Sequence, residues 1–332
     1  MLHRFLPLLL LILVGLPALG SGYELQPLTT RNLAPSVIGF GLPTLGPARV
    51  LQSGSGRVQV TYDLVSNFTE SNNSQEQLLF DGETSRVAIS GAYGVRNNLE
   101  FGAELPWISH QGGFLDGFVE GWHDTFGLPQ GGREQAESDR IDYRYTRAGG
   151  EGFSLNTQDS GFGDLSLRVA WQFWQSENKM RSLVLRSSLK LPTGDADRLT
   201  GSGSTDLALW LSGEQRLDTD IGPLIFYGGG GALLSTDGDL LADQRRNLVG
   251  LVSLGFGWQA LSRVGLQLQF DGHSALYEDS RFKELNKFAG QLSIGGSLAL
   301  TDRTVLELAV VEDVVVDTTP DVVFHLAIRQ QF

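Results

Sequence analysis

The sequence predicts an all-β fold, namely a transmembrane antiparallel β-barrel of about 12 strands with one amphipathic helix in a long extracellular loop. Three observations lead to this fold class: an export signal, strand-length segments with alternating apolar side chains, and connections that alternate between long and short. Membrane barrels have short periplasmic turns at one end and longer extracellular loops at the other. A soluble sandwich has no reason to place every long loop at the same end.

The amino terminus, residues 1–20, is predicted to be a cleaved secretory signal peptide. The basic residues His3 and Arg4 precede an apolar run, and Ala18 and Gly20 place small residues at the positions that a signal peptidase reads. Proline and glycine keep the apolar run shorter than the roughly 20 residues that a membrane span needs. Together with the barrel pattern, this signal predicts the outer membrane of a Gram-negative bacterium as the location.

Segments of about ten residues with a period of two dominate the rest of the chain. We count twelve, at roughly 57–65, 84–93, 98–107, 163–174, 182–192, 205–216, 223–234, 248–259, 263–273, 287–299, 303–312 and 321–332. In the fourth segment, Leu165 and Leu167 alternate with Ser166 and Arg168. The seventh is the least regular, because four consecutive glycines from Gly228 erase the pattern and let a strand bend or pack closely.

The connections between these segments alternate in length. Long 66–83 precedes short 94–97, and very long 108–162 precedes short 175–181. Closure into a barrel is expected because each unpaired backbone group in hydrocarbon costs several kcal/mol, so that the sheet can have no edge. Aromatic residues near the strand ends agree with the girdles of membrane barrels; they are Trp107, Trp174, Trp258 and Tyr227.

The last strand ends on Phe332. This ending resembles the signature by which outer-membrane assembly machinery recognises barrels, so that this machinery is an expected partner. Outer-membrane lipids and lipopolysaccharide are the other expected surroundings of the barrel.

Composition excludes several classes of protein. The chain has 332 residues, with 42 Gly, 25 Lys plus Arg and 38 Asp plus Glu, and a formal net charge of −13. Because it has no Cys, it has no disulfide framework, zinc ribbon, Fe–S cluster or cysteine nucleophile. The acidic balance without a basic cluster predicts no nucleic-acid partner. No cofactor is expected, and metal binding stays open.

The side chains that point into the barrel follow from parity once the apolar set is assigned to lipid. The inward ionisable residues are Asp63, Arg86, Glu100, Glu104, Arg168, Arg186, Lys190, Glu214, Asp271, Glu307, His325 and Arg329. We take Arg168, Arg186, Lys190, Asp271, His325 and Arg329 as the candidate luminal contacts of a solute. These groups either pair and fill the lumen or line a wet path, and their near balance of charge favours a narrow or occluded lumen.

Residues 21–56 precede the barrel domain, 57–332, and have no strand pattern. Val37 to Phe40 form the only apolar cluster, and prolines interrupt the segment at Pro27, Pro35, Pro43 and Pro47. The segment is expected either to fold into the barrel as a plug or to hang in the periplasm, and the plug would give its apolar side chains a place.

The third connection contains a predicted amphipathic helix at about 114–126. On a helical wheel, one face carries Phe114, Leu115, Phe118, Val119, Trp122 and Phe126. The opposite face carries Asp116, Glu120, His123 and Asp124.

Three interpretations of this helix remain open. Its apolar face packs on the barrel rim or in the outer leaflet, or residues 112–133 form a gate, or the acid–histidine stripe performs chemistry or holds a divalent ion. The candidate gate or binding residues are Asp116, Glu120, Trp122, His123 and Asp124. No catalytic residues are assigned and an enzyme is least favoured, because no GxSxG motif occurs.

Several short motifs resemble those of a known family. They are Arg31-Asn32, Pro43, Gly113 to Phe118, Trp122 to Asp124, Gly127 to Pro129, Gly132-Arg133, Gly161 to Asp164 and Leu191 to Asp195. On these residues the chain resembles a family of Gram-negative outer-membrane proteins catalogued as a domain of unknown function. The Gly163-Asp164 and Leu191 to Gly194 pieces also resemble barrels linked to phenol-degradation pathways, which are thought to pass hydrophobic small molecules. The resemblance implies a barrel and transport, and it supplies no established activity.

The function predicted from these features is a narrow or gated channel for small solutes, hydrophobic ones among them. The alternative is a structural or surface-binding barrel whose loops contact lipopolysaccharide. A lipid-modifying enzyme of the outer membrane is the third and least favoured hypothesis.

Overall fold

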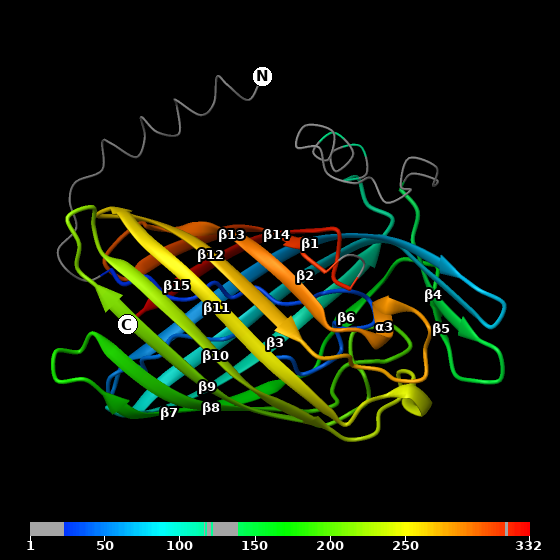
Figure 1. The fold of residues 1–332 in the computed structure, drawn as a ribbon, viewed down its shortest axis with the longest axis horizontal. Helices are drawn as coiled ribbons and strands as arrows, with labels where there is room; N and C mark the ends of the chain where they lie inside the picture. The colour runs from blue at the N-terminus through cyan, green and yellow to red at the C-terminus, as the bar shows by residue number, and fades with distance from the viewer. Residues whose placement is uncertain (1–22, 116, 118–120, 122–138, 316–317) are drawn as a thin grey trace.

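The structure, a computed structural model, describes residues 23–115, 117, 121, 139–315 and 318–332. Twelve of its strands close into an antiparallel barrel (Figure 1). They are β1 (Gly56–Asn72), β2 (Glu76–Arg96), β3 (Leu99–Gln111), β7 (Ser166–Gln175), β8 (Arg181–Lys190), β9 (Asp206–Leu217), β10 (Leu224–Ser235), β11 (Leu248–Leu261), β12 (Val264–His273), β13 (Ala289–Ala299), β14 (Thr304–Asp313) and β15 (Val322–Gln331). The predicted fold class is confirmed.

Closure is made by the first and last strands of the barrel. β1 pairs with β15 from Arg57 opposite Gln331 to Ser66 opposite Val322. β3 pairs with β7 across the longest connection. Because every barrel strand has two neighbours, the barrel itself is closed, which is the condition for a strand structure in hydrocarbon.

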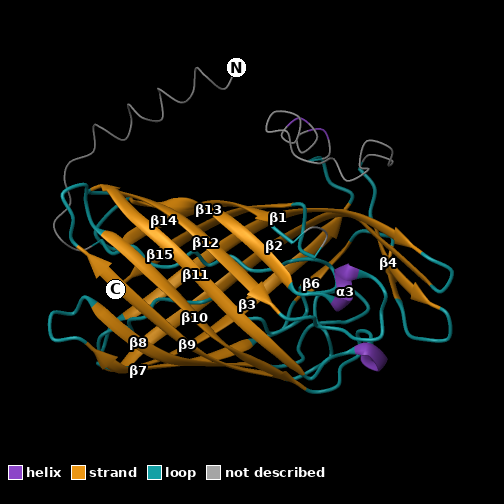
Figure 2. Ribbon diagram, in the orientation of Figure 1, coloured by secondary structure: helices purple, strands orange, loops and turns teal. Residues whose placement is uncertain are grey.

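The two ends of the barrel differ. Residues 97–98, 176–180, 218–223, 262–263 and 300–303 connect strands at the end where β15 finishes, which we call the short-turn end. The opposite, long-loop end carries the remaining connections (Figure 2). Those connections include β4 (Asp142–Arg147), β5 (Phe153–Leu155), β6 (Asp159–Phe162), the 3₁₀ helix η3 (Ala242–Gln244) and the short helix α3 (Lys283–Asn286).

The first connection is a correction to the sequence analysis. Residues 66–72 and 76–83 are not a loop but continue β1 and β2, so that only 73–75 remain as a turn. β4 adds to this extension by pairing with β2 between Glu76 and Asp81.

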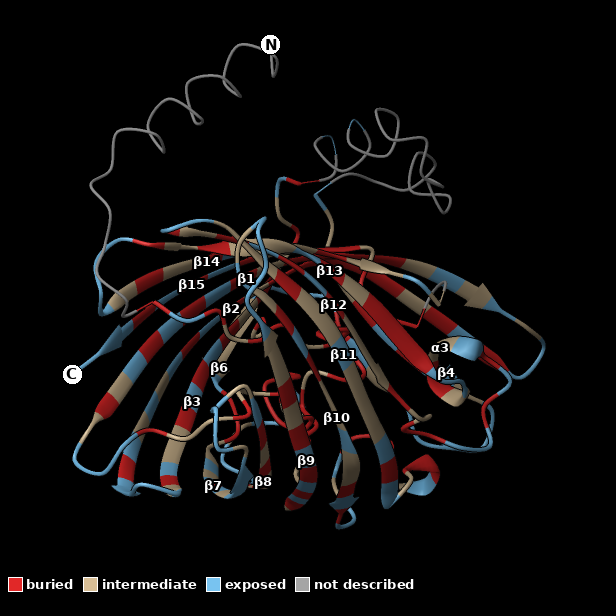
Figure 3. Cartoon of the chain, turned by 60° about the vertical axis from the view of Figure 1, so that its left-hand side comes forward, coloured by how far each residue is buried: buried red, intermediate tan, exposed pale blue. Residues whose placement is uncertain are grey.

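The outer and inner faces of the barrel differ sharply in polarity. Leu266 and Leu268 of β12 are 49% and 45% exposed, whereas Gln267 and Gln269 on the same strand are 4% and 0% exposed. The same banding runs along the other strands (Figure 3). The apolar residues therefore cover the outside and polar residues line the inside, as in a barrel that faces lipid.

The aromatic residues near strand ends follow this division with one exception. Trp107 and Phe162 lie on the outside, 42% and 59% exposed, with ring centroids 4.9 Å apart. Trp174 is also exposed, and the indole of Trp258 donates to the Ile221 carbonyl at 2.8 Å. Tyr227 was expected in a girdle, but it is only 5% exposed and its hydroxyl accepts a hydrogen bond from Gln267 inside the barrel. Its position on β10 gives it the inward parity.

Residues 23–55, which we call the luminal segment, lie inside the barrel (Figure 1). The segment enters at the short-turn end and ascends along β12 to β15, where the Leu28 N–H donates to Gln269 at 2.9 Å. It turns at 35–40 near the long-loop end, where the Tyr277 hydroxyl donates to the Ser36 carbonyl at 2.7 Å. It then descends, and the Leu51 N–H donates to Glu100 at 2.9 Å. Both ends of the segment are therefore at the short-turn end.

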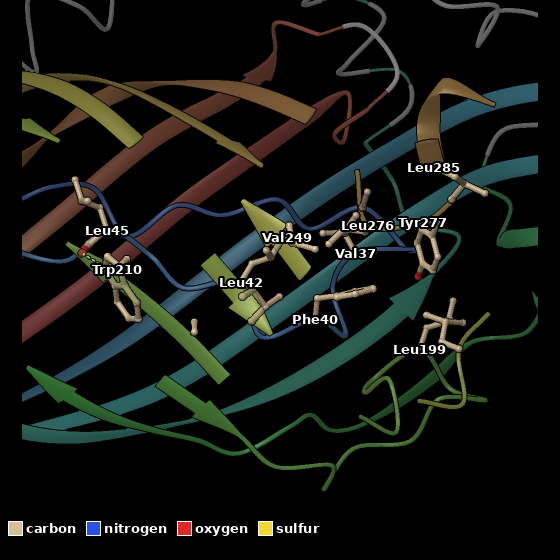
Figure 4. Close-up of a cluster of buried hydrophobic side chains, with 14 of the residues drawn as sticks. Val37, Phe40, Leu42, Leu45, Leu199, Trp210, Val249, Leu276, Tyr277 and Leu285 are labelled. Carbon is tan, nitrogen blue, oxygen red and sulfur yellow. Dashed lines mark hydrogen bonds between the residues drawn. The ribbon is translucent and has the colours of Figure 1, made fainter. Parts of the chain in front are cut away.

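The turn of the luminal segment joins a hydrophobic cluster at the long-loop end (Figure 4). The ring of Phe40 meets Tyr277 edge-on with centroids 5.6 Å apart, and the Arg245 guanidinium lies 3.9 Å from the Phe40 ring centroid. Lower in the barrel, the indole of Trp210 donates to the Leu45 carbonyl at 2.9 Å. The cluster thus ties the segment to the loops above it and to β9 below it.

Gly229 shows how the glycine-rich strand β10 allows the luminal segment to pack closely against it. A Cβ at this position would lie 2.7 Å from the Leu45 side chain and 2.2 Å from the Leu211 carbonyl oxygen. Only glycine permits this close approach.

No helix among the described residues is long and apolar enough to cross a membrane.

Candidate functional site

The middle of the lumen is organised around the carboxylate of Glu104. It accepts charge-assisted hydrogen bonds from Arg31 of the luminal segment at 3.0 Å, Arg86 of β2 at 2.6 Å and Arg168 of β7 at 2.7 Å. Three cations around one carboxylate leave a local excess of positive charge. We call these four residues the Glu104 cluster.

A second group of ionisable residues joins β1, β14 and β15. His325 lies between two carboxylates, with its Nδ1 2.6 Å from Asp63 and its Nε2 2.9 Å from Glu307. An imidazole with an acceptor at each nitrogen donates at both only when it is doubly protonated. Glu307 also accepts from the backbone and hydroxyl of Thr29, which fixes the ascending part of the luminal segment.

A third group lies nearer the long-loop end. The Lys190 ammonium is 2.7 Å from Asp164 and 3.3 Å from Asp206, and it donates to the Gly39 carbonyl at 2.8 Å. Arg245 reaches the same Asp206 at 3.3 Å. These bonds hold the turn of the luminal segment against the connections around it.

Asp164 also orders the connection after β8. Its carboxylate accepts the Gly194 N–H at 2.7 Å, and the Thr193 hydroxyl accepts the Leu165 N–H at 2.8 Å. The Gly163-Asp164 and Leu191 to Gly194 pieces, which are remote in sequence, therefore meet in space.

The six luminal candidates from the sequence occupy different places in this network. Arg168 belongs to the Glu104 cluster and Lys190 to the third group. Asp271 accepts from Ser253 at 2.6 Å and from Thr30 at 3.3 Å. The remaining three are His325, which lies between its carboxylates, and Arg186 and Arg329, which line a cavity. Their contact with a solute stays a prediction.

Three cavities follow one another along the β1–β3 and β7–β8 side of the lumen. The vestibule, about 750 Å³, is at the short-turn end and shares Gln26, Arg57 and Arg329 with the next cavity. That cavity, the arginine cavity, measures about 80 Å³. The terminal cavity, about 30 Å³, begins at the Glu104 cluster and is bounded by Ile108 and Thr200. The polar space therefore narrows from the short-turn end inward.

The five candidate gate residues, Asp116, Glu120, Trp122, His123 and Asp124, lie outside the described residues, as does most of the predicted helix at about 114–126. What the structure describes is the start of that connection. Glu83 of β2 accepts the backbone N–H groups of Phe114, at 2.7 Å, and Leu115. Gly113, at φ +86°, permits this approach, since a Cβ there would be 1.8 Å from the Glu83 carboxyl carbon.

A polar contact at the long-loop end stands outside the barrel proper. The Glu76 carboxylate accepts from the Tyr145 hydroxyl at 2.8 Å and from the Arg281 N–H at 2.9 Å. Burial favours the neutral acid, but these hydrogen bonds outweigh it and lower the pKa of Glu76. Burial and the neighbouring Glu76 raise the pKa of Tyr145 to about 12. The contact fastens β2, β4 and the connection before β13 together.

Sequence analysis missed several arginines of the lumen, among them Arg31, Arg57 and Arg49, the last of which lies 2.6 Å from Glu214. Arg57 has the same parity as Asp63 on β1, so that extending the strand pattern by a few residues finds it. Arg31 lies in the luminal segment, where no period assigns a direction to a side chain. Among the described residues, no group of three or more His, Asp or Glu side chains is arranged to hold a metal ion.

The chain belongs to the family described as "Protein of unknown function (DUF3187)", which matches residues 6–332. The resemblance to an uncharacterised family is thereby confirmed. No curated protein matches the chain.

Solved structures of outer-membrane channels are similar to the chain. The crystal structure of the COG4313 outer membrane channel from Pseudomonas putida F1 has a TM-score of 0.55 and 12% identity, over 86% of this chain and 98% of that chain. The NanC porin has a TM-score of 0.44 and 10% identity, over 83% and 98% of the two chains. The P. putida toluene transporter TodX has 0.38 and 11%, over 84% and 89%. The first likeness shows a shared fold, that of an outer-membrane channel.

Proposed function

Since the chain belongs to a family without an assigned function and has the fold of an outer-membrane channel, we propose that it is a narrow, gated outer-membrane channel for small solutes. The observation that carries the proposal is the series of three polar cavities beside the luminal segment. A barrel that served only as an anchor would gain nothing from polar space that narrows from an open vestibule. The short-turn end then faces the periplasm.

The luminal segment stays in place during passage in this proposal. It buries eight large apolar side chains, which are Leu25, Leu28, Leu33, Val37, Phe40, Leu42, Leu45 and Leu51. At about 1.5–3 kcal/mol for each, removing the segment would cost about 12–24 kcal/mol. A solute therefore passes beside the segment, through the cavities.

The size of the arginine cavity limits the solute that the middle of the path can hold, before the gate. Its 80 Å³ corresponds to roughly five to eight water molecules. A single small organic molecule fits this space, whereas an oligosaccharide or a peptide does not. A hydrophobic body with a small polar group remains compatible with the expectation from the sequence.

The gate in this proposal is the long-loop end of the path. Beyond the terminal cavity, His110 hydrogen bonds through its Nε2 to the Leu199 carbonyl at 3.2 Å, and Glu83 holds the start of the 112–133 region. The residues proposed earlier for gating, His123 and its neighbours, belong to that region.

Planar-bilayer recording tests the channel and its gate together. The test variant replaces 114–138 by two glycines, which is feasible because Gly112 lies against Asp139: a Cβ on Gly112 would be 2.0 Å from the Asp139 carbonyl oxygen. We expect small, brief conductance from the unaltered protein and larger, sustained conductance from the variant. A control replaces the exposed turn 148–152 and should conduct like the unaltered protein. Absence of conductance in all three would contradict the channel and favour a structural barrel.

The proposal also includes the surroundings of the barrel. Outer-membrane lipids would contact the apolar outer face, and lipopolysaccharide the long-loop end. The assembly machinery would recognise the last strand, β15, with Phe332. Crosslinking from the outer face of β15 in cells, compared with crosslinking from β12, checks the last of these partners.

A further inference from the structure

The arginine cavity carries an excess of positive charge, and we propose that it binds the oxyanion group, a carboxylate or a phosphate, of a small solute. Two carboxylates line the cavity, those of Glu100 and Glu104. Six arginines line it as well: Arg31, Arg57, Arg86, Arg168, Arg186 and Arg329. Its role in transport rests on the proposed channel, whereas the binding site is formed by these residues alone.

The two carboxylates already have cationic partners. Glu104 accepts from three arginines at 2.6–3.0 Å. Glu100 accepts from Arg57 at 3.2 Å and from the Leu51 backbone. Each of the two is thus already bound to at least one guanidinium.

Among the described residues, Arg186 and Arg329 have no carboxylate within ion-pair distance. Both are more than nine-tenths buried, at 8% and 9% exposure. Arg186 donates to the Pro47 carbonyl, and its Nε has no hydrogen-bond partner in the part of the chain that the structure describes. Within the same residues, the Arg329 guanidinium has no hydrogen bond or ion pair. A buried cation without a counter-charge is costly, so that an anion beside these two groups is favoured.

Carboxylates near the cavity do not supply the missing charge. Asp63 lies 3.3 Å from Arg86 and 2.6 Å from His325, and Glu307 is bound to His325 and Thr29. Glu214 is a third such acid, and it already accepts from Arg49 at 2.6 Å and from Arg216 at 2.9 Å. With these three acids and these two arginines included, eight guanidinium groups face five carboxylates.

The chemistry and the access of the site fit a small oxyanion. A guanidinium presents parallel N–H donors that match the two oxygens of a carboxylate or phosphate. Arg329 lines both the vestibule and the arginine cavity, so that a solute from the short-turn end meets Arg329 before Arg186. Arg186 lines the arginine cavity beyond the vestibule.

Titration calorimetry on the whole purified protein in detergent tests the site. The ligands are benzoate, inorganic phosphate, and benzyl alcohol as the uncharged counterpart of benzoate. We expect one site for an anion and none for benzyl alcohol; benzoate alone identifies an organic carboxylate as the ligand, and phosphate alone a phosphate. Arg186→Gln and Arg329→Gln should each weaken binding about tenfold, because each removes a charged hydrogen-bond donor.

Arg181→Gln is the matched control, because Arg181 is on the same strand as Arg186 but exposed. It should bind as the unaltered protein does. Heat-dependent mobility in SDS gels shows which variants are folded, and Arg186→Lys and Arg329→Lys, which keep the charge, replace any glutamine variant that is not. Lysine should retain part of the affinity.

Two results overturn the proposal: no binding of either anion, or anion binding that none of the Arg186 and Arg329 variants weakens. The outcome is separable from that of the channel. Anion binding without conductance would support the anion site and contradict the channel. Conductance without anion binding or anion selectivity would support the channel and contradict the anion site.

Discussion

At the scale of single residues, the lumen depends on a few carboxylates that each serve several cations. Glu104 is the clearest case, since its carboxylate bonds to arginines from the luminal segment, β2 and β7. Removing the charge leaves three guanidinium groups facing one another in a site that is about nine-tenths closed to water. The effect of such a change is therefore larger than that of one lost hydrogen bond.

We expect Glu104→Gln to lower the free energy of unfolding by about 3–5 kcal/mol, the usual cost of breaking a buried ion pair from one side. Urea unfolding in detergent or lipid, followed by gel mobility, measures it. Glu70→Gln is the control, because Glu70 is exposed on β1. An equal effect of the two substitutions would show that the cluster contributes little.

Glu76 predicts how the long-loop end responds to acid. Its folded pKa lies below the ordinary value, so that it stabilises the fold fully above the ordinary pKa of a glutamate. This stabilisation is lost as the pH falls through the lower, folded pKa. The hydrogen exchange of β4 and of the connection around Arg281, divided by the intrinsic rate at each pH, should therefore increase below about pH 4.

The Glu76→Gln variant separates this effect from general acid unfolding. Its exchange should be faster than that of the unaltered protein at pH 7, and it should change less between pH 7 and pH 3. If both proteins respond alike to acid, another carboxylate is responsible.

The sequence predicts that a side chain faces the lumen only where the residue belongs to a strand. Of the twelve ionisable residues that parity directs inward, ten are buried, because a period of two leaves a strand residue no other choice of face. Arg31 had no such constraint. Its meeting with Glu104 depends on the path of the luminal segment, and neither composition nor spacing determines that path.

At the scale of elements, the length of β1 and β2 shows where the alternation signal ends. The exposed apolar residues of β1 stop at Tyr62 and those of β2 begin at Val87, although the hairpin continues to Asn72 and Glu76. Beyond the apolar band the alternation is lost, because residues 66–72 are polar except for Phe68 and because Leu78, Leu79 and Phe80 follow one another. The sequence of the protruding hairpin therefore resembles that of a loop. The sequence reveals the part of a strand that faces lipid, and the protruding part has no comparable signature.

The luminal segment is an element without regular hydrogen bonding, and its stability comes from side-chain packing at its turn. Phe40 packs on Tyr277 and beneath Arg245. We expect Phe40→Ala to cost about 3–5 kcal/mol, as a truncated core phenylalanine does, and Phe40→Leu clearly less. Urea unfolding gives the stability, and bilayer recording gives the effect on the path.

If the segment narrows the lumen, Phe40→Ala should also raise conductance. The exposed Phe162→Ala, on the outer face, is the comparison for loss of an aromatic ring. Unchanged conductance together with the expected loss of stability would mean that the turn supports the fold without limiting passage.

At the scale of the whole molecule, the decisive feature is the contrast between an apolar outside and a charged inside. In a soluble protein the opposite distribution is the rule, and an apolar surface of this extent would lead to aggregation. Inside the barrel, the charged side chains are neutralised by ion pairs and by bonds to the luminal segment. The apolar outer face has no such cover within the protein and requires a lipid environment. The predictions on the channel and its anion site all presuppose this placement.

A pair of arginine substitutions on the outer face tests the placement. Leu268 lies in the middle of β12 and is 45% exposed, whereas Leu300 lies in a connection at the short-turn end and is 41% exposed. Arginine on the lipid face costs about 2–4 kcal/mol near the bilayer midplane and about 0–1 kcal/mol near the interface. Leu268→Arg should therefore destabilise the protein in lipid vesicles far more than Leu300→Arg, as measured by urea unfolding. Because the two leucines are similarly exposed, a difference in exposed surface area cannot explain a difference in cost. Equal costs, or a protein that stays monodisperse in buffer without detergent, would mean that the outer face of the barrel does not face lipid.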